Sequence, residues 1–322
     1  MLMSFRWFGP DDRVTLENIR QIPGVVGIVS ALHEVPPGEV WPQDALRRLG
    51  DRIAAAGLRF AVAESIPVHE DIKLGRATRD RLVENYCRSV RNLGEAGVPV
   101  LCYNFMPVFD WMRTELALRL PDGSLTMAYD DAALARIDLS RSMSGLAAWA
   151  GSYDGAELAA LLAAYRGVDS ERLWENLGWF LERVAPAAEA AGVRLALHPD
   201  DPPWGIFGLP RIVIGALAAN DLPAMVRRVG KRIYFAHCRN VRITGERKFE
   251  ETPHPSRFGG VNLLEVLRAL YEVGFDGPMR PDHGRMIWGE TGRPGYGLHD
   301  RALGAMYLQG LWEALTEREV PR

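Results

Sequence analysis

The 322-residue sequence predicts an α/β fold, specifically a (β/α)8 TIM barrel that forms a single domain over residues 1–322. Amphipathic helix patterns end in glycine and are followed at once by apolar strands, as at Gly57, Gly97, Gly192, Gly230 and Gly274. Glycine just past a helix accepts the left-handed conformation that closes the last turn. Apolar strands that alternate with helices are typical of a parallel sheet covered by helices.

The second observation is the number of strands. We expect about seven, near residues 5–8, 25–31, 58–64, 98–104, 193–198, 232–238 and 277–282. Seven strands in one continuous alternation come close to eight, which favours a barrel over a doubly wound sheet. No G-x-G-x-x-G sequence follows the first strands, which argues further against a dinucleotide-binding sheet.

A long interval, residues 105–170, follows the fourth predicted strand. It contains turn-rich sequence at 149–155 and a helix pattern near 156–166. Because such a length is unusual for a simple loop, we interpret it as an insertion over the active-site face, a lid.

Composition excludes several classes of protein. The net charge of −3 and the pI near 6.2 give no electrostatic footprint for nucleic acid. No apolar run reaches the roughly 18 residues of a membrane span, and the N-terminus does not resemble a signal peptide. Three widely spaced cysteines, Cys87, Cys102 and Cys238, argue against a disulfide framework. We therefore expect a cytoplasmic protein without nucleic-acid or membrane partners.

Polar side chains collect at six predicted strand ends, where barrel enzymes build their active sites. These residues are Ser30 and His33; Glu64 and Ser65; Tyr103 and Asn104; His198, Asp200 and Asp201; His237, Arg239 and Asn240; and Arg280, Asp282 and His283. Four of the six ends carry histidine, which points to a reactive site rather than to chance.

A metal site is the first hypothesis for these strand ends. His198, His237 and Asp282 are expected at equivalent depths on three late strands. Two neutral imidazoles and a carboxylate suit Mn²⁺, Fe²⁺ or Zn²⁺ with open positions for a substrate. The alternative for each histidine is a hydrogen-bonded barrel residue. Cys102 is interpreted as a core residue.

Further residues are candidates for proton transfer and substrate binding. His283 is suited to proton transfer near neutral pH, and Tyr296 lies on a glycine-rich loop where a phenol either exchanges a proton or only packs. Arg6, Arg239 and Arg280 match a substrate carboxylate in geometry. His33, His69 and Asn104 complete the candidate substrate contacts, whereas the neighbouring Glu70 and Asp71 fit a solvated loop.

Several long blocks of the sequence resemble the D-mannonate dehydratases of hexuronate catabolism. The blocks include "FRWFGPDD", "GIVSALH", "ESIPVHEDIKLG", "CYNFMPVFDW", "FAHCRNV", "RPDHGRMIWGE" and "RPGYGLHDRALGA", and the resemblance runs from Phe5 to about Ala314. It implies a xylose-isomerase-like TIM barrel and a hydro-lyase that converts D-mannonate to 2-keto-3-deoxy-D-gluconate with Mn²⁺ or Fe²⁺. It also implies metal ligands at His198, His237 and Asp282, and a catalytic pair at His283 and Tyr296. The expected partners are this sugar acid and a second copy of the chain, as a homo-oligomer, a dimer.

The sequence departs from the family pattern in one place. The family has a further strand after "GLPRIV", and its cysteine is a fourth metal ligand; here "PRIVI" passes directly to "GALAANDLP". Only about 35 residues separate His198 from His237, too few for two βα units. We therefore expect a segment to be missing between Ile214 and Gly215, with a chain break or an overlong peptide link there; the alternative is a true deletion.

Two other functions stay open at this point. One is a metal-dependent sugar isomerase or epimerase on the same barrel, which would release no water. The other is a non-catalytic sugar-acid-binding relative, if the cysteine-bearing strand is truly deleted.

Overall fold

A seven-stranded parallel sheet forms the centre of the molecule in a computed structural model, which describes residues 1–137, 153–214 and 221–316. The strand order is β7–β4–β3–β2–β1–β11–β8. The bounds are β1 (Leu2–Arg6), β2 (Gly27–Ser30), β3 (Arg59–Glu64), β4 (Val100–Tyr103), β7 (Arg194–Leu197), β8 (Ala236–Cys238) and β11 (Pro278–Pro281). All seven predicted strands are confirmed, although the first begins earlier than expected, at Leu2.

The sheet is open between β7 and β8. Within the described parts of the chain, β7 pairs only with β4 and β8 pairs only with β11. An eighth strand between these two edges is therefore not observed among the described residues. The expected break or overlong link at 214–215 lies outside them, because the description stops at Ile214 and resumes at Asp221.

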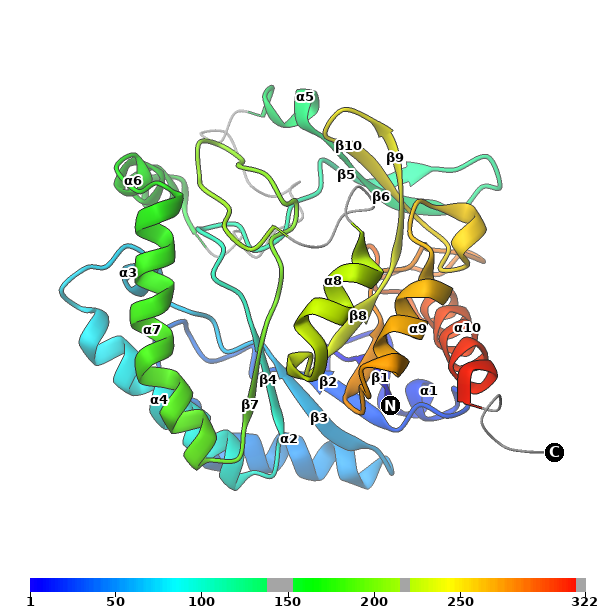
Figure 1. The fold of residues 1–322 in the computed structure, drawn as a ribbon, viewed down its shortest axis with the longest axis horizontal. Helices are drawn as coiled ribbons and strands as arrows, with labels where there is room; N and C mark the ends of the chain where they lie inside the picture. Colours follow the sequence, from blue (N-terminus) through cyan, green and yellow to red (C-terminus); the bar gives the residue numbers. More distant parts are fainter. Residues whose placement is uncertain (138–152, 215–220, 317–322) are drawn as a thin grey trace.

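Helices cover the outside of this sheet (Figure 1). The helices of the described residues are α1 (Leu16–Arg20), α2 (Gln43–Ala55), α3 (Glu70–Lys73), α4 (Arg79–Glu95), α5 (Asp131–Leu134), α6 (Gly155–Tyr165), α7 (Ser170–Ala190), α8 (Leu222–Val229), α9 (Leu263–Glu272) and α10 (His299–Thr316), of which α5 lies apart from the parallel sheet. Helices α2, α4 and α7 form one run of neighbours, and α8, α9 and α10 form another. The predicted glycines at the helix ends all have positive φ: Gly57, Gly97, Gly192, Gly230 and Gly274.

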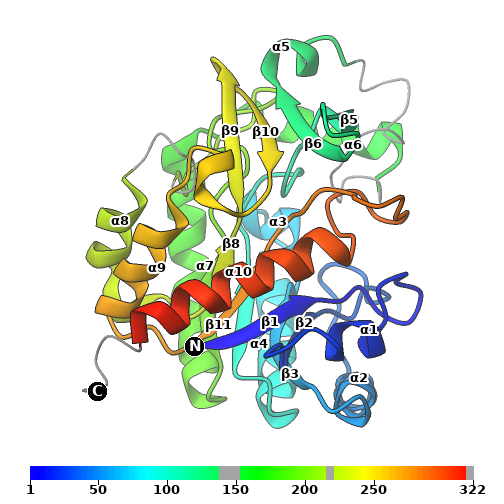
Figure 2. The same ribbon diagram turned by 90° about the vertical axis from the view of Figure 1, so that its right-hand side faces the viewer.

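A second, antiparallel sheet lies over one end of the parallel sheet (Figure 2). Its order is β5–β6–β10–β9, with β5 (Glu115–Arg119), β6 (Leu125–Asp130), β9 (Asn240–Gly245) and β10 (Lys248–Thr252). Strand β9 begins two residues after β8 ends, so this small sheet stands at the carboxyl ends of the parallel strands. The hairpin of β9 and β10 was not predicted, because "NVRITGERKFEET" has few apolar residues to mark a strand.

Residues 105–170 supply half of the small sheet and two helices. Strands β5 and β6 and helices α5 and α6 all lie in this interval. Helix α6 matches the helix predicted near 156–166, and Asp154 caps it by accepting hydrogen bonds from the backbone of Ala156 and Glu157. The predicted turn at 149–152 lies outside the described residues.

Two hydrophobic clusters join the helices to the parallel sheet. One lies beneath α4 and α7 and the other beneath α1, α9 and α10. Phe180 of α7 is fully buried in the first cluster and packs against the rings of Tyr86, Tyr103 and Phe105 at centroid distances of 5.0, 5.8 and 5.8 Å. This ring cluster fixes α7 against β4.

The Phe180→Ala substitution is expected to lower the free energy of unfolding by about 3–5 kcal/mol, because it removes a buried ring and leaves a cavity. The matched control is Trp174→Ala on the same helix, where the side chain is 51% exposed, with an expected change within about 0.5 kcal/mol. Equilibrium urea denaturation measures both. Equal effects of the two substitutions would contradict this packing.

Candidate functional site

A cavity of about 710 Å³ opens at the carboxyl ends of the parallel strands. Residues at the ends of four strands line one side, among them Arg6, Glu64, Cys102 and Asp282. Residues from the 105–170 interval line another side, including Trp111 and Tyr153, Glu157 and Leu161. This volume is within the range of small-molecule sites in proteins.

The three predicted metal ligands come together at this end of the barrel. The ring centroids of His198 and His237 are 4.9 Å apart, and His237 Nδ1 lies 3.8 Å from Asp282 Oδ1. His198 Nδ1 donates a hydrogen bond to the carbonyl of Pro199 at 2.6 Å. This bond fixes the proton on Nδ1 and leaves the Nε2 lone pair available to a ligand.

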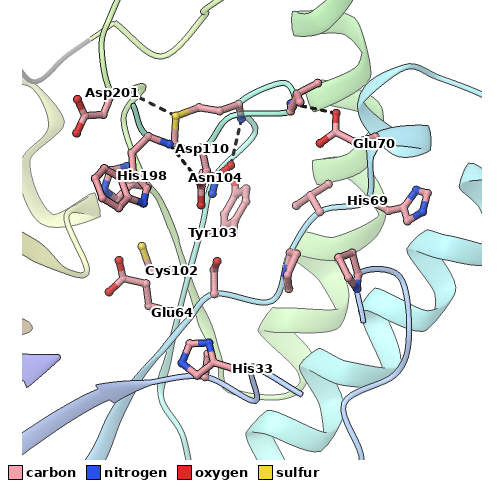
Figure 3. A pocket seen from close by; sticks show the side chains of 18 of the residues that line it. His33, Glu64, His69, Glu70, Cys102, Tyr103, Asn104, Asp110, His198 and Asp201 are labelled. Carbon is pink, nitrogen blue, oxygen red and sulfur yellow. Dashed lines mark hydrogen bonds between the residues drawn. The ribbon is translucent and has the colours of Figure 1, made fainter. Parts of the chain in front are cut away.

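A second group of donor atoms includes residues that were not predicted as ligands. Ligand atoms of Glu64, Cys102 and His237 all lie within 4.8 Å of one another, and Figure 3 shows the Glu64 carboxylate beside the Cys102 thiol. Cys102 was expected to be a core residue; it is buried, but it also lines the cavity. The pairing of β3 with β4 explains this, because Glu64 and Cys102 are register partners.

The donor atoms at this position suit a divalent cation. His237 Nε2 and Glu64 Oε2 are buried without a hydrogen-bond partner among the described residues. Burial, together with the charge of Arg280, lowers the pKa of His237 to about 4, so its imidazole is neutral near pH 7. A neutral imidazole beside carboxylates is the donor set that Mn²⁺, Fe²⁺ and Zn²⁺ accept.

The arginines proposed to bind a substrate carboxylate are already paired within the protein. Arg280 contacts Asp282 Oδ1 at 2.8 Å and Glu64 Oε1 at 3.2 Å, while Arg6 donates to the backbone carbonyl of Glu64. Burial opposes ionisation of both carboxyls, but the nearby Arg and His groups outweigh it and hold the pKa of Glu64 and Asp282 well below the usual values. Arg239 is not among the cavity-lining residues and pairs with Asp201 at 2.8 Å.

His283 and Tyr296 form a hydrogen-bonded pair on the cavity wall. His283 Nε2 lies 2.9 Å from the Tyr296 hydroxyl, and His283 Nδ1 lies 2.7 Å from Glu251 Oε1. Burial raises the pKa of Tyr296 above its usual value, and the Asp282 charge adds to this, so the phenol keeps its proton. The structure therefore brings together the two residues singled out for proton transfer and adds a carboxylate behind them.

A cluster of charged residues lies behind His283: Arg113, Asp201 and Glu251 are buried, and Arg239 is partly buried. Arg113 donates two hydrogen bonds to Asp201, both at 3.0 Å, and two to Glu251, at 3.0 and 2.6 Å. Sequence reasoning did not single out Arg113 or Glu251, because neither follows a predicted parallel strand. The alternation of buried and outward residues in "KFEET" is the signal that could have indicated an inward-facing Glu251.

An aromatic and cationic corner lies beside Tyr296. The Phe8 ring stacks on His33 at 5.8 Å and meets Tyr296 edge-on at 4.8 Å. The guanidinium groups of Arg6 and Arg293 lie 4.7 and 4.2 Å from the centre of the same ring. Burial lowers the pKa of His33 to about 3, and the charges of the two arginines contribute. Two cationic side chains, those of Arg6 and Arg293, therefore meet at this corner of the cavity lining.

The remaining predicted contacts line the cavity farther from His283. Asn104 Oδ1 accepts a hydrogen bond from the backbone of Met106, and His69 Nδ1 accepts one from the backbone of Asp71 at the start of α3. Glu70 was expected in a solvated loop, but it is buried and contacts Lys73 and the Tyr165 hydroxyl, each at 2.6 Å. The hydrogen bond that Tyr165 donates to Glu70 ties α6 to α3, which explains the burial.

Comparison with known structures first defines the class of fold. A xylose isomerase domain protein from Planctomyces limnophilus superimposes with a TM-score of 0.52 at 12% identity, covering 98% of both chains. The chain therefore shares the fold of this xylose isomerase domain protein. The crystal structure of mannonate dehydratase from Streptococcus suis serotype 2 is much more similar, with a TM-score of 0.91 and 45% identity over 99% of this chain and 95% of that chain.

Sequence comparisons identify the family. The D-mannonate dehydratase (UxuA) family model matches residues 1–218 and 213–321. Mannonate dehydratases of Streptococcus uberis and Thermotoga neapolitana are 48% and 50% identical over 345 and 356 residues, covering 98% of this chain and 99% and 98% of theirs. The chain belongs to the D-mannonate dehydratase family, a family of hydro-lyases, and the predicted resemblance is confirmed. Within the described ranges, no helix is long and apolar enough to cross a membrane.

The lowered pKa of His33 predicts the direction of a pH dependence of stability. As the pH falls below 6.5 the unfolded chain binds a proton at this residue, whereas the folded protein binds it only at a lower pH, so stability is lost on acidification. From pH 7 to pH 5 the metal-free wild type should therefore lose more free energy of unfolding than His33→Gln, by a small margin because solvent reaches this exposed side chain and screens the charges of the arginines. Urea denaturation at both pH values measures the difference. Equal losses would mean that His33 titrates normally in the folded protein.

Proposed function

We propose that the cavity binds D-mannonate and that the protein removes water from it, giving 2-keto-3-deoxy-D-gluconate. Family membership supports the substrate and the reaction. The observation that carries the chemistry is the His283–Tyr296 hydrogen bond beside Asp282 on the wall of a cavity of sugar-acid size.

We further propose that His198, His237 and Asp282 hold a Mn²⁺ or Fe²⁺ ion. The closeness of His237 Nδ1 to Asp282 Oδ1, at 3.8 Å, and the free Nε2 lone pair of His198 support this assignment. When bound, such an ion supplies positive charge that stabilises the enediolate formed when the C2 proton leaves. The fourth, cysteine ligand implied by the resemblance has no counterpart after Ile214 in this sequence.

The substrate carboxylate needs a cationic partner in the cavity lining. The guanidinium groups of Arg6 and Arg293 both lie against the Phe8 ring on the cavity wall, beside His33. We assign the charged end of the sugar acid to this corner, because a guanidinium forms charge-assisted hydrogen bonds with a carboxylate.

The elimination requires one group to take the C2 proton and another to protonate the departing C3 hydroxyl. We assign the first role to His283, whose Nε2 accepts a hydrogen bond, and the second to Tyr296, whose phenol keeps its proton in the buried site. The C2–H bond breaks as Nε2 gains the proton, the C2–C3 double bond forms, and the C3 hydroxyl leaves as water with the Tyr296 proton. The 2.9 Å contact between the two residues then returns the proton from His283 to Tyr296, and the enol becomes the 2-keto acid.

The 105–170 interval is proposed to cover the site. Its residues Trp111, Tyr153 and Leu161 line the cavity, and Trp111 lies 5.4 Å from the His283 ring. A cover made of aromatic and apolar side chains would exclude bulk water from the site.

We also propose that, relative to its family, this chain lacks a strand-bearing segment after Ile214. Three observations support this: the unpaired facing edges of β7 and β8 among the described residues, the division of the family match at 213–218, and alignments of 345 and 356 positions against a chain of 322. The eight-stranded barrel would then be the family's arrangement, and this chain would hold seven of its strands.

His283→Asn is expected to reduce kcat for formation of the 2-keto acid from D-mannonate by about 100-fold to 10,000-fold, because it removes the base and leaves a smaller polar side chain in its place. The assay contains added Mn²⁺ and detects both the 2-keto acid and the loss of water by mass. Mn²⁺ binding, followed by electron paramagnetic resonance, should be unchanged in the variant.

Three outcomes would contradict the proposal. Wild-type kcat in His283→Asn would remove this residue from the reaction. Exchange of aldose and ketose sugars without loss of water would instead identify an isomerase or epimerase. Binding of D-mannonate by the wild type with no turnover at any Mn²⁺ concentration would identify a non-catalytic relative.

A further inference from the structure

We propose that Glu251 is the positioning residue for His283: its carboxylate holds the proton on Nδ1 and so keeps Nε2 free to act as the base. The inference rests on the role proposed above for His283. Glu251 is not itself a cavity-lining residue, whereas His283 is, so Glu251 acts on the site through the histidine ring.

The hydrogen bonds at the two ring nitrogens define the tautomer. Ionised Glu251 has no proton to give, so the 2.7 Å contact requires His283 Nδ1 to be the donor. The other neighbour of Nδ1 is Arg239 at 3.3 Å, and a guanidinium can only donate. Nδ1 cannot donate to Glu251 and accept from Arg239 at the same time. The contact with Glu251 is shorter and charge-assisted, so we assign the proton to Nδ1. Nε2 therefore carries the lone pair that receives the Tyr296 hydroxyl hydrogen at 2.9 Å.

Glu251 is itself held in place by Arg113. The same oxygen that meets His283, Oε1, accepts hydrogen bonds from Arg113 Nε at 3.0 Å and Nη2 at 2.6 Å. Arg113 is fully buried and also forms a bidentate ion pair with Asp201. Asp201 in turn accepts a hydrogen bond from Arg239. Two cations and two anions thus balance within the cluster, so the carboxylate needs neither solvent nor a ligand to remain ionised.

The origin of Glu251 explains why the barrel alone cannot supply this contact. Glu251 lies on β10 of the small sheet, where it pairs with Val241 of β9, and it reaches back to a histidine 32 residues away. The adjacent Glu250 points the other way and pairs with Arg242, whose side chain is more than half exposed. Two neighbouring glutamates on one strand therefore offer a test residue and a matched control.

Two substitutions separate the charge of Glu251 from its hydrogen bond. In Glu251→Leu only Arg239 remains near Nδ1, so the ring should switch to the Nε2–H tautomer, which cannot accept the C2 proton. We expect kcat to fall by at least about 1,000-fold with KM within about threefold, as for other histidine bases held in the wrong tautomer. In Glu251→Gln the amide oxygen can keep the contact without the charge, and a fall of about 10-fold to 100-fold is expected. Glu250→Gln should match the wild type in both constants.

The ring itself gives a readout that is independent of turnover. Nitrogen NMR of protein labelled in its histidines, with His283 assigned through its loss in His283→Asn, distinguishes Nδ1–H from Nε2–H. The wild type should be Nδ1–H, and Glu251→Leu should be Nε2–H. A folded Glu251→Leu with wild-type kcat, or with its His283 proton still on Nδ1, would overturn the inference.

Failure of this inference differs from failure of the proposed function. If His283→Asn keeps full activity, the catalytic role of His283 is wrong, but the tautomer measurement still decides whether Glu251 positions the ring. If Glu251→Leu does not fold, because Arg113 is left with one partner, Glu251→Gln decides instead. Wild-type kcat in Glu251→Gln would then overturn the inference, and a fall with unchanged KM would support it.

Discussion

The site depends on one buried interaction, the double contact of Arg113 with Asp201 and Glu251. Asp201 follows a strand of the parallel sheet, whereas Arg113 precedes β5 and Glu251 lies on β10 of the small sheet. Breaking such a pair would leave a charge buried without compensation, which costs far more than an exposed ion pair contributes. The contact therefore fixes the small sheet over the barrel and fixes the groups around His283 at the same time.

Charged side chains at the strand ends that line the cavity are also paired with one another. Arg280 lies between Glu64 and Asp282, and these three groups carry a net charge of about −1 before any ligand enters. Adding a divalent ion and then an anionic sugar acid changes the local charge first in one direction and then in the other. A bound ion therefore raises the affinity of the site for the anionic substrate, and bound substrate raises its affinity for the ion in turn.

The parallel strands and the residues at their carboxyl ends could be predicted from the sequence, because each of these strands is an apolar run and several follow a glycine that ends a helix. The same periodicity placed His198, His237 and Asp282 at one end of the barrel. It could not find Glu251 or Arg113, because β10 and the segment before β5 belong to a sheet whose strands are polar and pair across more than one hundred residues. Nor could it indicate that Arg239 and Arg280 are engaged internally, since ion pairing depends on packing between distant segments.

The central claim is that the His283–Tyr296 pair faces the reacting carbons of a sugar acid held above His198, His237 and Asp282. The most direct measurement is a crystal structure with Mn²⁺ and D-mannonate, using His283→Asn to prevent turnover and anomalous scattering to locate the metal. The account predicts a manganese peak among these three ligands, with C2 and C3 of the substrate next to Tyr296 and Asn at position 283. Manganese bound elsewhere, or a substrate whose C2 and C3 face away from this pair, would contradict it.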